Sequence, residues 1–143
     1  MKQAGKLKIL IANDDKDDRF FASLAFKEAD LDHTVDFVKD GEELIAYLNS
    51  ISGQAHLLPD LILLDLNMPK KDGRVALKEI RSDARFRNFN VIIFSTCISE
   101  EDRIYTQELG ASRHVTRPFD FQDLVVVIRD ICSTYTVAHA GKK

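Results

Sequence analysis

Short runs rich in apolar residues alternate along this chain with longer segments in which apolar residues recur every three or four positions. The runs cover residues 7–12, 33–38, 61–64, 91–94 and 113–116, and the longer segments cover 17–29, 42–51, 72–83, 100–109 and the stretch from 120 onward. Strands that are apolar on both sides are typical of parallel sheets covered by helices on both faces. The pattern therefore predicts an α/β fold of five strand and helix units, with the all-apolar run 61–64 as a central strand.

The length of 143 residues and the mass of 16.2 kDa fit one domain. A hydrophobic fraction of 45% and a charged fraction of 30% are typical of globular proteins. We expect residues 1–143 to form a single domain with a core at about 7–134 and a flexible tail at 135–143. Because the chain ends soon after the last predicted helix, we expect no separate output domain.

Charge and hydropathy exclude several classes of partner. The net charge of −3 gives no electrostatic reason to expect binding to nucleic acid or to an anionic membrane. No apolar run approaches the roughly 18 residues of a membrane span, and the N-terminus shows no signal-peptide pattern. A cytoplasmic location is therefore expected.

The periodic segments also predict which side chains face the core. The expected core residues are Phe20, Phe21, Leu24 and Ala25 in the first helix and Leu124, Val127, Ile128 and Ile131 in the last. Cys97 and Cys132 show no CxxC spacing, so both are interpreted as small buried residues. The 100–109 helix has a thin apolar face, which suits either a docking surface shared with the fifth strand and last helix or an ordinary solvated helix.

Polar residues follow three of the predicted strands. Asp14 and Asp15 follow the first strand, Asp65 follows the third, and Ser95 follows the fourth. In an open parallel sheet the carboxyl ends of the strands form the ligand-binding edge, so these side chains are expected to converge. Three converging carboxylates repel one another unless a cation joins them, and Mg²⁺ prefers a few oxygen ligands completed by water. The sequence therefore predicts a Mg²⁺ site.

Asp65 is the candidate nucleophile because it ends the most apolar strand. A carboxylate beside a metal ion can attack phosphorus and form an aspartyl phosphate. The adjacent Asp14 and Asp15 suit metal ligation. Taken one motif at a time, the alternative is that Asp14 and Asp15 begin a turn and cap the first helix while Asp65 starts a loop. The combination of the motifs favours the site.

Several of these motifs together resemble the receiver domain of two-component response regulators, the CheY-like family. The matching pieces are Asp14-Asp15, the Asp-Leu-Asn-Met-Pro stretch at 65–69, Gly73, Ser95 and the Arg-Pro-Phe stretch at 117–119. Ser95 lies 30 residues after Asp65, and Arg117 lies 22 residues after Ser95, as in that family. The resemblance covers about residues 7–134. It implies a flavodoxin-like, doubly wound, five-stranded parallel sheet of order 2-1-3-4-5 with helices on both faces.

The resemblance also assigns roles to the site residues. It implies that Asp65 is the phosphoryl acceptor and that Asp15, Asp65 and the backbone carbonyl of Asn67 are Mg²⁺ ligands. Asp14 would act nearby through water. Ser95 would donate its hydroxyl to a phosphoryl oxygen, which agrees with the expectation that a small hydroxyl at a strand end can turn toward a new anionic acceptor.

Two positions depart from the family pattern. Arg117 stands where the family has a lysine, and His114 stands where it usually has a switching tyrosine or phenylalanine. A forked guanidinium does not substitute freely for a compact ammonium. The resemblance predicts a cis Arg117–Pro118 bond and a guanidinium that pairs at rest with Asp65 or Asp14 and moves to the phosphoryl group after transfer. If its bulk keeps Arg117 out of the cleft, Asp65 still accepts the phosphoryl group but coupling to His114 is altered.

The implied function is two-component signal transduction. The domain would take a phosphoryl group on Asp65 from a sensor histidine kinase and signal by conformational change to a downstream protein partner, with no enzymatic activity beyond its own phosphorylation and dephosphorylation. The Lys-Lys-Asp-Gly stretch at 70–73, the Ser-Glu-Glu-Asp stretch at 99–102 and the long segment before the third strand are most similar to stand-alone regulators paired with bacterial phytochromes. A homodimer is compatible with the sequence.

Two other functions stay open on the sequence alone. A receiver-like binding module that has lost phosphorylation is suggested by Arg117. A Mg²⁺-dependent phosphohydrolase with an aspartate nucleophile resembles this chain only at Asp65. Such enzymes have a second aspartate two positions later as general acid, where this chain has Asn67, and they carry a cap domain that this chain lacks.

Overall fold

The computed structural model of the chain describes residues 6–29 and 32–140. The strands are β1 (Lys8–Ala12), β2 (Thr34–Val38), β3 (Leu61–Leu64), β4 (Val91–Ser95) and β5 (Arg113–Thr116), and the helices are α1 (Lys16–Glu28), α2 (Gly41–Ile51), the short 3₁₀ helix η1 (Ala55–Leu57), α3 (Gly73–Ser82), α4 (Glu100–Glu108) and α5 (Phe121–Ala140). The five strands form one parallel sheet in the order β2-β1-β3-β4-β5. The predicted fold class and strand order are confirmed.

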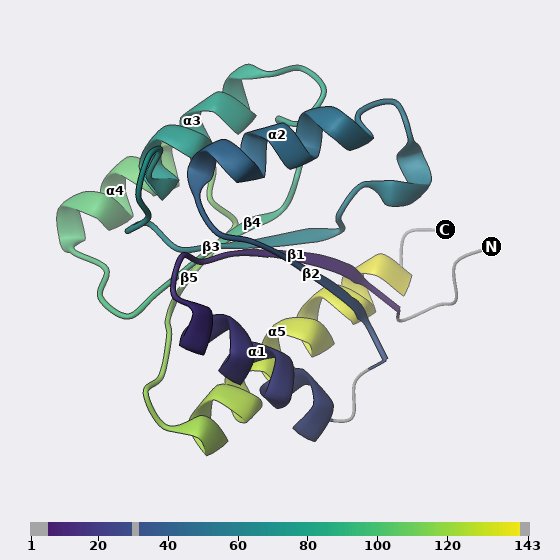
Figure 1. The fold of residues 1–143 in the computed structure, drawn as a ribbon, viewed down its shortest axis with the longest axis vertical. Coiled ribbons are helices and arrows are strands. Elements are labelled where there is room, and N and C mark those ends of the chain that lie inside the picture. Colours follow the sequence, from purple (N-terminus) through teal and green to yellow (C-terminus); the bar gives the residue numbers. More distant parts are fainter. Residues whose placement is uncertain (1–5, 30–31, 141–143) are drawn as a thin grey trace.

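Helices cover both faces of the sheet (Figure 1). α1 and α5 lie side by side on one face, whereas α2, α3 and α4 cover the other. This arrangement follows from the parallel strands, because each strand must be connected to the next by a crossover that passes over a face of the sheet.

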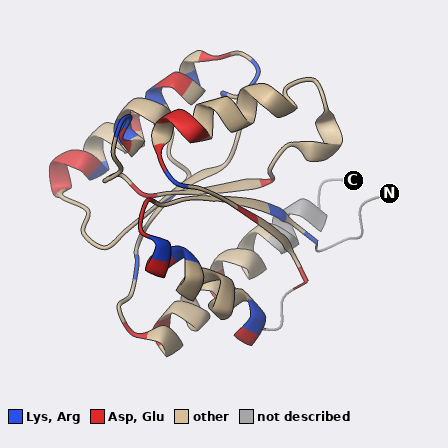
Figure 2. Ribbon diagram, in the orientation of Figure 1, with Lys and Arg blue, Asp and Glu red and all other residues tan. Residues whose placement is uncertain are grey.

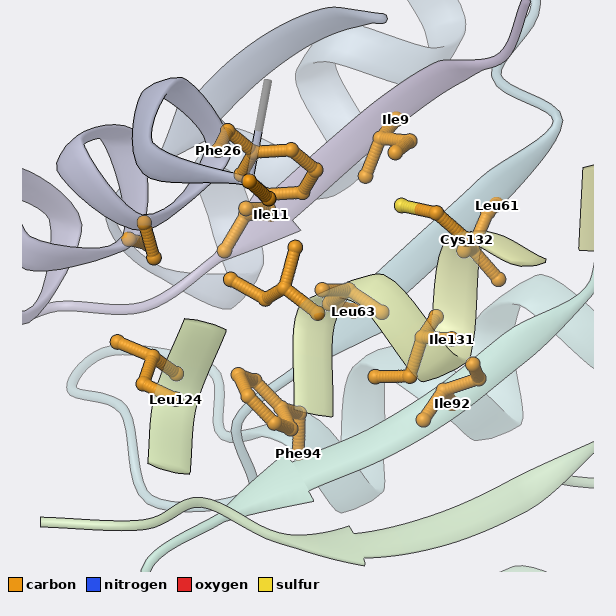
Figure 3. Packing of buried hydrophobic residues seen from close by; sticks show 14 of the residues in the cluster. Ile9, Ile11, Phe26, Leu61, Leu63, Ile92, Phe94, Leu124, Ile131 and Cys132 are labelled. Carbon is orange, nitrogen blue, oxygen red and sulfur yellow. The ribbon is translucent and has the colours of Figure 1, made fainter. Parts of the chain in front are cut away.

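Two apolar cores fill the space between the sheet and its helices. Under α1 and α5, side chains of β1, β3 and β4 meet Phe26, Ile128 and Ile131, and Figure 3 shows this packing. The second core joins the other side of the same strands to α2 and α3. All four residues of β3 are buried, so the prediction of a central strand is confirmed.

The crossovers bring the carboxyl ends of all five strands to one edge of the sheet. Ala12 pairs in register with Leu64, and Ser95 pairs with Thr116 at the ends of the strands. The helices that follow these ends begin with acidic turns in α1, α2 and α4, and Figure 2 shows these acidic residues on the left of the view. The edge is therefore the polar end of an otherwise apolar sheet.

The prediction that Phe20 and Phe21 of the first helix face the core is wrong. Phe20 and Phe21 are 58% and 47% exposed, whereas the buried residues of the helix are Ala22, Ala25 and Phe26, followed by Ala29. These four positions have the spacing i, i+3, i+4 and i+7, and they place small side chains where α1 packs on the sheet. In α5 the predicted Leu124, Ile128 and Ile131 are buried, and Val127 is half-buried.

Two further expectations differ from the structure. Residues 135–140 of the segment expected to be a flexible tail belong to the helix α5, which contains no glycine or proline. Residues 141–143 of that segment lie outside the described residues. Cys97 is exposed after β4, whereas Cys132 is buried, as expected, with a pKa raised by burial to about 12. Within 6–29 and 32–140, no helix combines the length and apolar character needed to cross a membrane.

Candidate functional site

Asp65 follows β3 directly and is only 9% exposed. Its Oδ1 accepts hydrogen bonds from the Ser95 hydroxyl at 2.8 Å and from the Asn67 backbone N–H at 3.1 Å. Burial raises the pKa of Asp65, and repulsion from Asp14 adds to the rise; the two hydrogen bonds and the charge of Arg117 oppose it. Asp65 is therefore an ordered and largely desolvated carboxyl group, which is a suitable environment for a nucleophile.

Ser95 ends β4 and is fully buried. Its Oγ donates to Asp65 Oδ1 and accepts from the Leu66 backbone N–H at 2.9 Å. The hydroxyl thus links the candidate acceptor to the first backbone N–H of the β3–α3 loop. The structure brings Asp65 and Ser95 together although they lie 30 residues apart in the sequence.

The two adjacent aspartates after β1 have different roles in the structure. Asp15 is the N-cap of α1, and its Oδ1 accepts from the backbone N–H groups of Asp17 at 2.8 Å and Asp18 at 3.1 Å. Asp14 is exposed, and of the two it is the one whose charge acts on Asp65. The capping role that the sequence left as an alternative therefore holds for Asp15.

The oxygen donors at this edge fit a hard cation that keeps several waters. Across 6–29 and 32–140, no three His, Cys, Asp or Glu side chains are grouped closely enough to hold a metal ion by themselves. The two carboxylates that interact across this edge, Asp14 and Asp65, offer oxygen atoms only. Mg²⁺ prefers such a set, because it is commonly bound by one or two carboxylates with waters in the other positions.

Two glycines hold the loop that carries Asn67. A Cβ on Gly73 would collide with the backbone oxygen of Asp65, and a Cβ on Gly41 would collide with that of Lys71. The Gly41 N–H donates to the Lys71 carbonyl at 2.9 Å, and the Gly73 N–H donates to the Leu66 carbonyl at 3.0 Å. The close approach of Gly41 to Lys71 was not predicted from the sequence, although a glycine at such a position is its signal.

Arg117 lies beside the site but binds elsewhere. Its Nη2 donates to Asp18 Oδ2 in α1 at 2.6 Å, and both side chains are mostly buried, with 13% and 25% exposed. The predicted resting pair with Asp65 or Asp14 is therefore wrong. The predicted cis Arg117–Pro118 bond is also wrong, because this bond is trans, as most X-Pro bonds are. The Arg117 side chain is long enough for its guanidinium donors to extend to the first turn of α1.

His114 is joined to α4 through a buried hydroxyl. Its Nε2 lies 2.7 Å from Thr106 Oγ1, which donates to the Asp102 carbonyl at 2.8 Å. Which of the two groups donates depends on the tautomer of the imidazole. Burial lowers the pKa of His114, and the positive charge of Arg103 lowers it further, which favours the neutral ring.

A second contact to α4 was not predicted from the sequence. The Arg74 guanidinium at the start of α3 donates twice to the Asp102 carboxylate, with both distances 2.6 Å, and a third nitrogen lies 3.4 Å from the Leu66 carbonyl. Nothing in the sequence pattern indicates a pair 28 residues apart. Arg74 thus connects the residue after Asp65 to the first turn of α4.

The sequence from 9 to 129 matches the response regulator receiver domain, and the chain belongs to this family. Receiver domains are signalling modules of two-component systems. The expected resemblance is confirmed.

Among its relatives, the chain is 32% identical to response regulator Rcp1 of Synechocystis sp. over 124 residues, which cover 86% of this chain and 84% of Rcp1. It is similar to the crystal structure of the phosphorylated cyanobacterial phytochrome response regulator RcpA, with a TM-score of 0.80, 35% identity and coverage of 91% and 94% of the two chains. The structure of the Mn²⁺-bound form of Rcp1 matches with a TM-score of 0.78, 31% identity and the same coverage.

Proposed function

We propose that this domain accepts a phosphoryl group on Asp65 from a sensor histidine kinase of the phytochrome type. The observation that carries the proposal is the desolvated Asp65 carboxylate at the end of the central strand, held by the Ser95 hydroxyl at 2.8 Å. The phytochrome partner is supported by the similarity to RcpA, which is described as a phytochrome response regulator.

The proposed chemistry is in-line transfer to a carboxylate oxygen. An Asp65 oxygen attacks phosphorus, the bond from phosphorus to the imidazole nitrogen of the kinase histidine breaks, and the electron pair stays on that imidazole. Ser95 then donates its hydroxyl to the new phosphoryl group. Transfer leaves Asp65 as a mixed anhydride with more negative charge and more acceptor oxygens than the carboxylate had.

We place Mg²⁺ on Asp14, Asp65 and the carbonyl of Asn67. These residues would hold the ion, which when bound would neutralise negative charge on the transferred group. We leave Asp15 outside this set, because its Oδ1 accepts two backbone N–H bonds at the start of α1. A bound divalent cation is described for Rcp1, where it is Mn²⁺.

We propose that the signal passes from the site to a downstream protein through α4 and β5. Arg74 ties the β3–α3 loop to Asp102, and His114 ties β5 to Thr106 in the same helix. Ile104 and Tyr105 on α4 are 51% and 38% exposed and available to a partner. We place the protein in the cytoplasm with protein partners and no nucleic-acid partner, in keeping with its net charge of −3.

The two alternative functions, a phosphohydrolase and a phosphorylation-impaired binding module, have less structural support. A phosphohydrolase needs a second proton-transfer group near the acceptor, and the residue at that position is Asn67, whose backbone N–H is bonded to Asp65. A phosphorylation-impaired module is favoured by one observation, which is that Arg117 is bound by Asp18.

The test of the proposal is covalent labelling. The protein is incubated with acetyl phosphate and Mg²⁺, and intact mass spectrometry counts the phosphoryl groups on the wild type, Asp65→Asn and Asp14→Ala. We expect one group on the wild type, none on Asp65→Asn, and slower labelling of Asp14→Ala. An unlabelled wild type in the presence of an active donor supports the impaired module instead.

A further inference from the structure

The guanidinium of Arg117 is only partly satisfied in the structure. Its Nη2 is bonded to Asp18, whereas its Nε is buried and has no hydrogen-bond partner among the described residues. A buried donor of a charged group without an acceptor is unfavourable, and such a group is expected to take an acceptor when one comes within reach. The guanidinium therefore has one hydrogen-bonded donor, Nη2, and one donor without an acceptor, Nε.

The position of this side chain is fixed from both ends. The Arg117 backbone N–H donates to the carbonyl of Ser95 at 2.7 Å, and the hydroxyl of the same Ser95 is bonded to Asp65, so the residue is anchored beside the strand next to the candidate acceptor. Asp18 is fixed in the first turn of α1, because its own N–H is bonded to the N-cap Asp15. The charge of Arg117 reaches Asp65 without bonding to it in this arrangement.

We propose that Asp18 is a positioning residue that holds Arg117 on α1 while Asp65 is unmodified, and that the phosphoryl group takes the guanidinium from it. This inference rests on the proposed function of Asp65. Forked, charge-assisted hydrogen bonds favour the acceptor of higher charge, and a phosphoryl group offers more charge and more oxygens than one carboxylate. Breaking the pair removes a contact between the end of β5 and the start of α1, made by two residues that are 99 positions apart in the sequence.

The pair also accounts for an arginine at this position. A lysine has a single compact ammonium, whereas a guanidinium has several donors in a fixed plane. While Asp65 is unmodified, one nitrogen is therefore bonded to Asp18 and another is left without an acceptor. The Asp18 carboxylate orders Arg117 and also competes with the phosphoryl group for its guanidinium. Asp18 therefore determines how much free energy is needed to move Arg117 to the phosphoryl group.

The experiment measures the affinity of the Mg²⁺ and beryllofluoride complex, which mimics the phosphoryl group, for the wild type and Asp18→Asn. Removing the competing charge is expected to tighten binding by about tenfold, the equivalent of one charge-assisted hydrogen bond. Asp17→Asn, an exposed neighbour on the same turn, is the matched control and is expected to bind as the wild type does. In an Arg117→Ala background, Asp18→Asn is expected to have no effect.

Nitrogen-15 NMR of the arginine side chains gives a readout that does not depend on phosphorylation. The Arg117 Nε–H signal is expected to shift in Asp18→Asn before any ligand is added, and to shift in the wild type when beryllofluoride binds. Equal or weaker beryllofluoride binding by Asp18→Asn, with the wild type binding normally, would overturn the role of Asp18 alone. A wild type that neither binds beryllofluoride nor becomes labelled overturns the proposed function of Asp65 instead.

Discussion

Replacing Asp15 by alanine separates helix capping from metal binding. In the structure its Oδ1 accepts two backbone N–H bonds, from Asp17 at 2.8 Å and Asp18 at 3.1 Å. Loss of an aspartate N-cap lowers the free energy of unfolding by about 1 kcal/mol. For a chain of 143 residues this corresponds to a fall in Tm of about 3 °C.

The measurement pairs urea unfolding with a Mg²⁺ titration on two variants. Asp15→Ala is expected to lose stability and to keep Mg²⁺ affinity within about threefold, since its side chain is outside the proposed ligand set. Asp14→Ala is expected to show the opposite pattern, with weaker Mg²⁺ binding and a stability equal to or above that of the wild type, because Asp14 is exposed and repels Asp65. An Asp15→Ala protein with wild-type stability and no Mg²⁺ affinity would refute this division of roles.

Three further outcomes are expected. Because burial raises the pKa of Asp65, the folded protein loses stability as the pH rises through that pKa. Asp65→Asn should therefore be more stable than the wild type at pH 7. In urea unfolding, this difference in the free energy of unfolding should vanish at a pH below the ordinary pKa of an aspartate. Gly73→Ala should lower the free energy of unfolding by about 1–3 kcal/mol, because its Cβ collides with the Asp65 carbonyl, and calorimetry showing no change would contradict the close approach. Thr106→Val should cost about 1–2 kcal/mol by leaving the His114 imidazole without its partner, and the shift of the His114 ring signals in NMR checks the contact.

The fold could be predicted from the sequence because its signals are local and mutually consistent. The four apolar residues of β3 require burial on both faces, and Gly110, with φ of +81°, ends α4 as its position predicts. The first helix shows the limit of such reasoning. Its phenylalanines satisfy helical periodicity, but the space against the sheet is taken by Ala22 and Ala25, and periodicity alone does not distinguish the two faces.

The site was predictable where backbone topology alone places a residue. Asp65 and Ser95 end neighbouring strands, so their meeting follows from a parallel sheet. The functions of Asp15 and Arg117 depend on side-chain choices that topology does not fix. Asp15 can face the cleft or cap its own helix, and a long arginine can reach either Asp65 or Asp18. Such choices are decided by competing hydrogen bonds, which no spacing in the sequence records.

Chemical mapping of the modified residue shows directly whether Asp65 is the phosphoryl acceptor. After phosphorylation by acetyl phosphate, borohydride reduction converts an aspartyl phosphate to homoserine, and peptide mass spectrometry locates the change. We expect homoserine at position 65 and at no other aspartate position. Reduction at Asp14 or Asp15, or retention of the phosphoryl group in Asp65→Asn, would contradict it.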